Sequence, residues 1–494
     1  MKEKLKAYFT ARSTRHAGSM AAFTALVLAL FYLVNLIVLG FADKLGWYFY
    51  TTEQLEVTLS PAADELFADI DTSKGKVKIL FCDVEENIET HSQLDYVYDT
   101  ALLLCERYPE LIELDFVNLW LEPARVAAYR TAKDGSENKI TSSTVIIDYG
   151  GEFILNSPVS FYTLDESNYV TSFNGEEVFV ANILWVTASE HPKAYFTANH
   201  GEEVPYALQR MLIYAGYEVE RLDLSTVRGV PEDAGLVVIS APLYNFQRAA
   251  AGSAEKAELS FLAEYLAGGG QVLAMLDPSY AETMKLPNGN PPHLVSFLSE
   301  YGITVTGNTL VDRQSALPGS GGYSLITSYA DRGVGATLGA AATAGGRRTV
   351  LSGTAALSLS ESDKATVSPI LYAPAGAVQL APDGSEVAHG AAPVLAMAET
   401  EGGGRLVVCG SVCLADAGII DGVGYGNKAL INALLTEMGA ARVPAGIANI
   451  QVDRSAIENL TMGEADLFLT ITAVVLPALL LGAGFVLLRR RKNH

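Results

Sequence analysis

The sequence of 494 residues lacks the short motifs of the common nucleotide-dependent and nucleophilic enzymes. It has no Gly-x-x-x-x-Gly-Lys-Ser/Thr loop, so the chain has no phosphate cradle of its own for nucleotide hydrolysis. It also lacks a Gly-x-Ser-x-Gly or Gly-x-Cys-x-Gly nucleophile elbow. The nearest candidates are Cys409 to Cys413, without the flanking glycines, and Ser240, where Pro242 breaks the turn. We therefore predict no catalytic nucleophile.

Cysteine is scarce, and no two cysteines form a Cys-x-x-Cys pair. That absence argues against thioredoxin-type redox catalysis and against a zinc site. Two of the cysteines lie in apolar runs, so buried thiols are favoured, although an even count leaves disulfide pairing open. We predict no metal ion and no cofactor. The four residues are Cys82, Cys105, Cys409 and Cys413.

Basic residues are few, with 34 Lys and Arg against 56 Asp and Glu and a net charge of −22. Nine basic residues and one acid lie in the two terminal tails, so the segment between them carries 25 basic and 55 acidic residues. A negative field of this size repels nucleic acid and anionic lipid. We expect no nucleic-acid partner.

Two apolar segments are long enough to cross a bilayer. Residues 20–41 and 467–488 each contain about 20 uncharged residues, which is the length a membrane-spanning helix requires. Basic residues flank both segments, in the tails at 1–19 and 489–494. Because positive charges near a span stay in the cytoplasm, we expect both termini there and the bulk of the chain outside the plasma membrane. A cleaved signal peptide is the alternative for the first segment, since small residues flank Phe41.

A first α/β domain is predicted over residues 75–190. Strands are expected at 76–83 and 111–120, helices at 93–110 and from 123, and a hairpin at 143–156 about a Tyr-Gly-Gly turn. This order of strands and helices is typical of a small thioredoxin-like domain.

A second, larger α/β domain is predicted over residues 191–441. Strands at 193–198, 217–224, 235–242 and 271–277 alternate with helices at 204–216 and 253–270, the second capped by Ser253. Such alternation with apolar strands predicts a mainly parallel sheet with helices on both faces.

The later part of this domain is rich in small residues. Residues 306–393 are expected to form an insertion that packs on the same domain, and a hairpin at 393–418 and a helix at 426–439 should follow. Linkers are predicted at 42–74 and 442–466. In the second linker, Thr461 and Glu464 have the spacing of a capping box that would start the helix of the last apolar segment.

Polar residues follow the first strand of the larger domain. In an α/β sheet, ligands bind at the carboxyl ends of the strands, and this loop lies at such an end. The alternative is structural, because a carboxylate is also favoured at the start of the next helix and Asp277-Pro278 can be a plain turn. The candidate ligand-binding or partner-binding residues are Asn199, His200, Gly201, Glu202, Pro242, Asp277 and Pro278.

The ordered set of features resembles the GldG-like family of gliding-motility ABC-transporter auxiliary components. The resemblance rests on YFTANHGEE at 195–203, LQRMLIYAGYEVERLDL at 208–224, VPEDAGLVVISAP at 230–242, EYLAGGGQVLAMLDP at 264–278, YGNKALINALL at 425–435 and RRRK at 489–492. The family's loop typically reads Gly-His-Gly-Glu, and Asn199 stands in place of its first glycine.

The resemblance implies a class I glutamine amidotransferase-like (flavodoxin-like) fold for the larger domain, without the nucleophile. It also implies a membrane-anchored accessory subunit whose partners are a multi-span ABC permease and a cytoplasmic ATPase. We therefore expect a non-enzymatic, extracytoplasmic binding or scaffolding subunit, with an envelope glycan or peptide as a candidate ligand. The alternatives are an ectoenzyme that hydrolyses envelope glycans or peptides, and a passive structural protein of the envelope.

Overall fold

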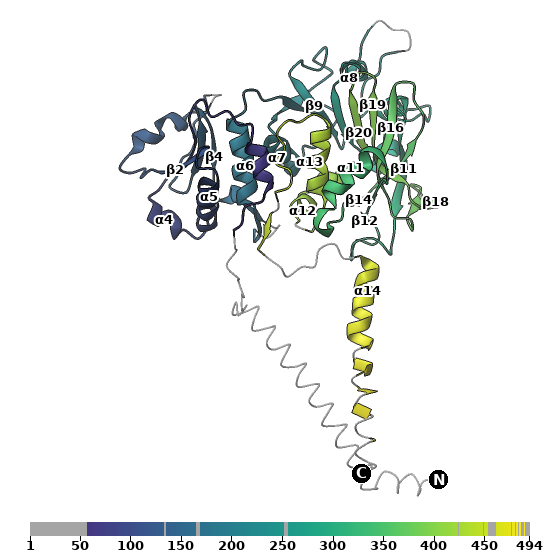
Figure 1. The fold of residues 1–494 in the computed structure, drawn as a ribbon. Helices are drawn as coiled ribbons and strands as arrows, with labels where there is room; N and C mark the ends of the chain where they lie inside the picture. Colours follow the sequence, from purple (N-terminus) through teal and green to yellow (C-terminus); the bar gives the residue numbers. More distant parts are fainter. Residues whose placement is uncertain are drawn as a thin grey trace. The chain divides into compact units, whose positions relative to one another are not determined.

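A computed structural model describes most of the chain after residue 56. Its residues are 57–132, 135–164, 168–250, 255–422, 424–447, 449–452, 461–475, 477–479, 481–482, 484–485 and 489. Contacts join Val57–His494 into one compact unit. The described residues form a mixed α/β structure with several sheets, as predicted (Figure 1).

The first sheet has four strands in the order β2-β1-β3-β4. β1 (Val77–Phe81) and β2 (Ile112–Phe116) are parallel and are joined through α4 (Glu85–Glu89) and α5 (Asp95–Arg107). β3 (Val145–Tyr149) and β4 (Glu152–Asn156) form the predicted antiparallel hairpin, and Gly150 and Gly151 supply the positive φ angles of its turn. Residues 123–130 differ slightly from the predicted α-helix, because η1 (Pro123–Arg130) is a 3-10 helix.

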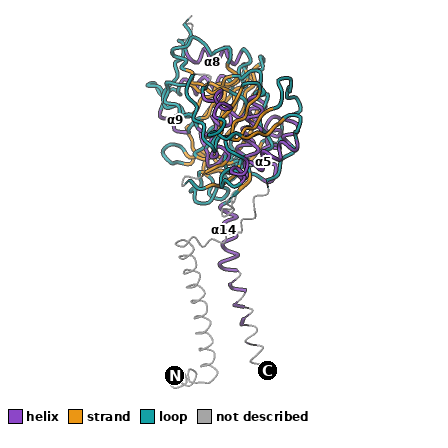
Figure 2. The backbone as a smooth tube through the Cα atoms, turned by 90° about the vertical axis from the view of Figure 1, so that its left-hand side faces the viewer, coloured by secondary structure: helices purple, strands orange, loops and turns teal. Residues whose placement is uncertain are grey.

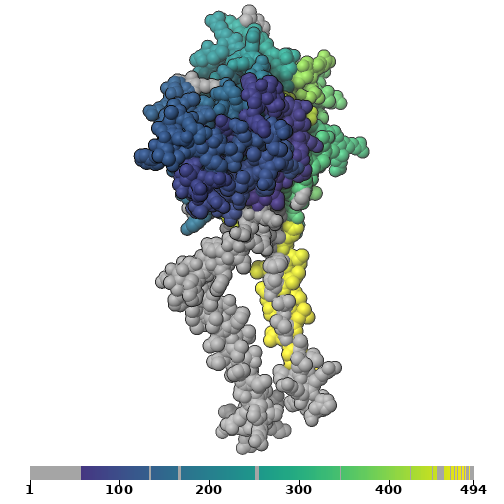
Figure 3. Space-filling view, turned by 60° about the vertical axis from the view of Figure 1, so that its left-hand side comes forward, coloured from purple at the N-terminus to yellow at the C-terminus, as the bar shows by residue number. Residues whose placement is uncertain are grey.

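A buried core joins this sheet to α5 and to α6 (Gly175–Val186). Two short elements within the predicted linkers complete it. α3 (Ala62–Phe67) buries Ala63 and Phe67, and β21 (Ile450–Gln451) pairs with β6 (Val170–Phe173), which also pairs with β5 (Tyr162–Leu164) after η2 (Pro158–Phe161). Figure 3 shows these N-terminal residues, in purple and blue, as one continuous surface.

The second sheet has eight strands in the order β13-β16-β19-β20-β10-β9-β7-β8. The five strands from β20 to β8 are parallel to one another. The other three extend the sheet beyond β20, and each pairs antiparallel with its neighbour. The predicted parallel sheet is therefore confirmed for one part of the sheet. The parallel strands are β7 (Lys193–Thr197), β8 (Glu218–Leu222), β9 (Ala234–Ser240), β10 (Gln271–Met275) and β20 (Arg405–Cys409), and the others are β13 (Ser328–Tyr329), β16 (Ala365–Tyr372) and β19 (Pro393–Thr400).

Helices cover both faces of this sheet, as predicted, and the strands lie inside (Figure 2). Alternate side chains of β9 point to opposite faces, so that Leu236 and Val238 join one core while Val237 and Ile239 join the other. The first core includes α7 (Tyr206–Tyr214), α11 (Gly333–Ala342), α12 (Ala417–Ile420) and α13 (Asn427–Glu437), and the second includes α8 (Glu258–Ala267), α9 (Pro278–Thr283) and α10 (His293–Glu300).

Part of the predicted insertion joins the larger sheet as β13 and β16, and other segments of it form two small sheets that pack on the larger one. Leu310, Leu325 and Leu351 from these sheets are buried in the same core as α7. One sheet has the order β15-β11-β17-β18, and β12 pairs with β14. The bounds of these strands are β11 (Ile303–Val311), β12 (Ser324–Ile326), β14 (Val350–Ser352), β15 (Ala355–Leu359), β17 (Val378–Leu380) and β18 (Glu386–His389). Short 3-10 helices follow α11, as η3 (Ala344–Gly346), and β20, as η4 (Val412–Ala415).

The capping box is confirmed at the start of α14 (Met462–Thr470). The Glu464 N–H donates to Thr461 Oγ1 at 3.1 Å, and the Thr461 N–H donates to Glu464 Oε2 at 2.8 Å. A short π-helix, η5 (Ile471–Val475), follows. In the described part of the chain, no helix has both the length and the apolar character needed to cross a membrane. The predicted span at 20–41 and the tail at 1–19 lie outside the described residues, and the span at 467–488 is described only in part.

Candidate functional site

The seven predicted site residues lie at the carboxyl ends of three neighbouring parallel strands. β7 and β9 are adjacent in the sheet, although β8 comes between them in the sequence. The chain leaves β7 toward one side and returns to β9 on the other, which makes their carboxyl ends a topological switch point, where doubly wound sheets bind ligands. Residues 199–202 follow β7, Pro242 follows β9, and Asp277 and Pro278 follow β10.

His200 is buried between two carboxylates. Its Nδ1 lies 2.9 Å from Glu202 Oε1, and its Nε2 lies 3.1 Å from Glu258 Oε2. The His200 N–H also donates to Glu202 Oε2 at 2.7 Å. The rings of Phe246 and His200 stack with centroids 3.8 Å apart. Both ring nitrogens of His200 are therefore hydrogen-bonded, and Phe246 covers one face of its ring.

The two carboxylates keep His200 protonated at neutral pH. Burial opposes the charged ring, but hydrogen bonds to Glu202 and Glu258 and their negative charge outweigh it and raise the pKa of His200 to about 9. Burial likewise opposes the Glu202 carboxylate, yet the hydrogen bond with His200 and nearby backbone N–H groups lowers the pKa of Glu202. A histidine that is already protonated and held at both nitrogens cannot serve as a general base.

The backbone around His200 has unusual dihedral angles. Asn199 has φ of 80° and Gly201 has φ of 77°, so the residues on both sides of His200 are left-handed. Asparagine tolerates this region better than most residues, so Asn199 can adopt a left-handed conformation without being glycine. Ala241, directly after β9, is also left-handed with φ of 48°. Such conformations persist only where the surrounding contacts fix them.

The loop after β9 folds over the switch point. The Leu243 and Tyr244 N–H groups donate to the His200 carbonyl at 2.7 and 2.9 Å, and Pro242 is buried below them. A Cβ atom at Gly201 would lie 2.9 Å from the Leu243 Cβ, so only glycine fits there. The outward face is formed by exposed residues, among them Leu243 at 59% and Tyr244 at 61% exposure.

Asp277 and Pro278 have the structural role that the sequence left open. The Asp277 carboxylate accepts the Ser279 N–H at 2.8 Å and caps α9, while Pro278 occupies the first turn of that helix. The hydroxyl of Tyr280, from the same helix, donates to the Tyr244 carbonyl at 3.3 Å. Asp277 and Pro278 thus support the loop over the switch point and take no part in the His200 cluster.

Sequence reasoning missed Glu258 and Phe246. Glu258 is the first residue of α8, so the helix begins five residues later than the cap predicted at Ser253. Ser253 itself lies outside the described residues. The signal for its role is its spacing. Glu258 precedes Leu262 and Leu266 on the apolar face of the helix, where a carboxylate requires a buried partner.

The cysteines are free thiols in the structure. Burial raises the pKa of Cys82 and of Cys409 to about 12, so neither is a reactive thiolate at neutral pH. The described residues include no group of three or more His, Cys, Asp or Glu side chains arranged to hold a metal ion.

Comparison with known proteins gives no family. No protein-family model matches the chain, and no curated protein matches it. Among solved structures, the mmIFT52 N-terminal domain is 17% identical with a TM-score of 0.39 and covers 50% of this chain and 98% of its own. PurLQS from Thermotoga maritima is 11% identical with a TM-score of 0.28, covering 50% and 99%. The cytoplasmic protein STM3548 from Salmonella typhimurium is 14% identical with a TM-score of 0.25, covering 45% and 88%. Similarities of this size identify no function.

Proposed function

We propose that the chain is a non-enzymatic, membrane-anchored binding or scaffolding subunit of an ABC-type transport system. The transport setting rests on the sequence resemblance to gliding-motility auxiliary components. The non-enzymatic character rests on one observation, namely that carboxylates hold both ring nitrogens of His200, the titratable side chain at the centre of the switch point.

The architecture is consistent with this proposal. From the edge of the sheet, the parallel strands lie in the order β8, β7, β9, β10, β20. Numbered along the chain, this is the order 2-1-3-4-5, the flavodoxin-like order of doubly wound sheets, which fits an amidotransferase-like domain. The strand order and the hairpin of the first sheet fit a thioredoxin-like domain.

A membrane anchor is supported by the side chains around α14. From residue 467 onward, large apolar side chains are exposed where water would be an unfavourable neighbour. A bilayer around these side chains would anchor the chain, and the basic residues at 489–492 favour residues 57–452 on its extracytoplasmic side. The exposed side chains are Leu467, Leu469, Ile471, Val474, Val475, Leu479, Leu481 and Phe485.

The outward face of the switch point is the proposed partner surface. Two backbone hydrogen bonds tie this loop to the His200 carbonyl, and the loop presents Leu243 and Tyr244 to the outside. Exposed apolar and aromatic side chains are typical of protein interfaces. The His200 cluster would then have a positioning role, because it touches the partner surface only through the loop.

Affinity purification of the full chain from detergent tests the proposal. We expect a multi-span permease and an ATPase with a phosphate-binding loop to copurify. Leu243→Asp should lower their recovery at least about tenfold if the residue is an interface hot spot. Val387→Asp is the matched control, since Val387 is similarly exposed at 56% but lies on β18. Purification of the chain without either subunit would refute the transport role.

A further inference from the structure

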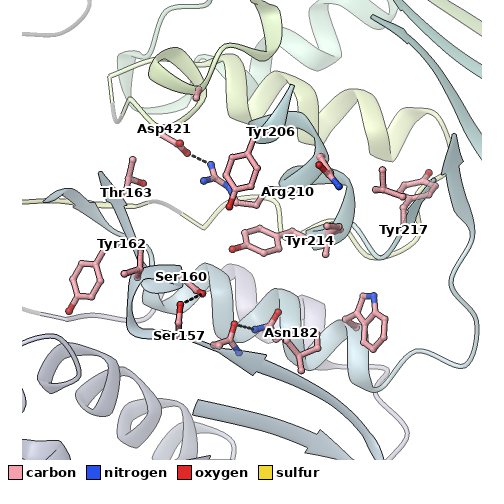
Figure 4. A pocket seen from close by; sticks show the side chains of 18 of the residues that line it. Ser157, Ser160, Tyr162, Thr163, Asn182, Tyr206, Arg210, Tyr214, Tyr217 and Asp421 are labelled. Atoms are coloured by element: carbon pink, nitrogen blue, oxygen red, sulfur yellow. Dashed lines mark hydrogen bonds and ion pairs between the residues drawn. The ribbon is translucent and has the colours of Figure 1, made fainter. Parts of the chain in front are cut away.

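A cavity of about 860 Å³ opens between α6 and α7, away from the switch point. Figure 4 shows Asn182 of α6 on one side and Tyr206, Arg210 and Tyr214 of α7 on the other. Residues of β4, η2 and β5 continue the first wall, and residues of β8 and α12 continue the second. We call this cavity the interhelix groove.

The groove contains a buried amide group that lacks a hydrogen bond. The Asn182 Nδ2 donates to Asn156 Oδ1 at 2.9 Å, and the two side chains belong to residues exposed at only 5% and 6%. The Asn156 Nδ2 has no hydrogen-bond partner among the described residues. A buried donor left without an acceptor costs about 1–3 kcal/mol. Since Asn156 lines the groove, a ligand acceptor that reaches its amide group would be favoured.

The interior of the groove is electrically balanced. Arg210 forms an ion pair with Asp421 across the wall, and both side chains are mostly buried. Their charges cancel, and Glu218 lies at the exposed end of β8. An anionic ligand would also meet the overall net charge of −22. Because the buried Arg210 and Asp421 already pair with each other, a further charge of either sign inside the groove would lose its hydration without gaining a buried partner. The groove therefore favours an uncharged ligand.

The walls offer apolar contacts and the edges of two sheets. Tyr206 is 72% exposed, Val159 51% and Ile213 38%, and all three line the groove. Among the described strands, β5 and β8 are each the last strand of a sheet, and residues of both line the groove. An edge strand presents unpaired backbone N–H and C=O groups that an extended peptide can pair with.

We propose that the interhelix groove binds an extended, uncharged peptide segment of a partner protein, with apolar side chains against the tyrosines and a backbone carbonyl on Asn156. A peptide supplies the amide acceptor, the neutrality and the strand pairing together. A glycan could stack on the tyrosines, but it would leave the edges of β5 and β8 unused. This inference is independent of the proposed transport role.

Selection of a random peptide library displayed on phage against the full chain tests the proposal. We expect enrichment of uncharged sequences with alternating apolar residues. A synthetic peptide of the enriched sequence should bind in a fluorescence polarisation titration. Ile213→Arg, which places a charge in the groove at a partly exposed position, should weaken this binding at least about tenfold.

Val227→Arg is the matched control, because Val227 is 41% exposed and lies outside the groove. It should bind the peptide as the unmodified chain does, and thermal unfolding should confirm that both variants fold. Tyr206→Ala, at a position 72% exposed, provides a second groove variant with little risk to folding. The proposal is wrong if no peptide is enriched, if the enriched peptides bind Ile213→Arg unchanged, or if maltohexaose or chitohexaose occupies the groove instead.

Discussion

His200 couples protonation to stability, because folding surrounds its ring with two carboxylates. Its pKa in the folded chain, about 9, lies above the ordinary value of 6.5. Folding therefore favours the protonated ring, and the stabilisation is complete below about pH 6.5 and lost as the pH rises through about 9. The contribution of Glu202 to stability depends on pH in the opposite direction. Its lowered pKa gives a contribution that is present above its ordinary value of 4.5 and lost as the pH falls below it.

We predict that the cluster stabilises the chain most between about pH 4.5 and pH 6.5. The free energy of unfolding should fall by about 3 kcal/mol between about pH 6 and pH 10 through His200. Urea titrations of the full chain at both pH values measure this loss. His200→Gln should remove much of the pH dependence. His389→Gln should preserve it, because the His389 side chain is 67% exposed. Identical pH dependence in His200→Gln would contradict the assignment.

The positions of the site residues could be predicted, but their roles could not. Alternation of strands and helices places the loops after β7, β9 and β10 at one edge of the sheet, and the seven residues follow from that rule. Glu258 could not be predicted in the same way, since it reaches His200 from α8, whereas His200 lies in the loop after β7. The sequence also cannot distinguish a left-handed Asn199 from an Asn199 that binds a ligand.

At the scale of elements, the capping box sets the start of α14. Thr461→Ala should remove the side-chain acceptor of the Glu464 N–H and destabilise the first helical turn by about 1 kcal/mol. Hydrogen exchange of the Glu464 amide in the full chain should then become faster. Thr461→Ser keeps the hydroxyl and should restore slow exchange. Exchange at the same rate in all three chains would show that another contact fixes this turn.

The ion pair of Glu464 with Arg348 should matter less than the cap. Arg348 Nη1 lies 3.0 Å from Glu464 Oε2, but the two side chains are 37% and 45% exposed. The hydrogen bonds to Arg348 and Thr461 lower the pKa of Glu464 to about 2. Solvent screening limits the contribution of such an exposed pair to less than about 1 kcal/mol.

Long, strongly patterned elements could be predicted from the sequence, whereas short ones could not. The apolar strands β9 and β10 and the hairpin of β3 and β4 stand out by pattern and turn residues. α3 and β21 are too short for a periodicity to show. They are stabilised by tertiary contacts, since Phe67 packs in the core that joins the four-stranded sheet to α5 and α6, and Ile450 pairs with Phe173.

At the scale of the whole molecule, one buried ion pair joins the two sheet regions. Lys428 Nζ of α13 lies 2.6 Å from Glu177 Oε2 of α6, and the side chains are 15% and 6% exposed. Lys428→Met should destabilise the chain by about 3–5 kcal/mol, because Glu177 would remain as an unpaired buried charge. Calorimetry of the full chain should show a lower unfolding temperature.

Replacing both partners separates the pair from its surroundings. The double variant Lys428→Met with Glu177→Met should recover most of the lost stability, since neither charge then remains buried alone. Lys364→Met is the surface control, because Lys364 and its partner Glu300 are 48% and 29% exposed. It should change the stability by less than about 1 kcal/mol. A double variant as unstable as the single one would show that packing, and not charge, joins the two regions.

The pairing of β6 with β21 constrains how the protein is made. Ser172 pairs with Gln451, so all eight strands of the larger sheet are synthesised between the two partners. The N-terminal core therefore remains unfinished while the ribosome is translating the larger sheet. Closing so long a loop slows folding and leaves the strand edge of β6 exposed in the meantime. The nascent chain should depend on a chaperone until β21 has emerged.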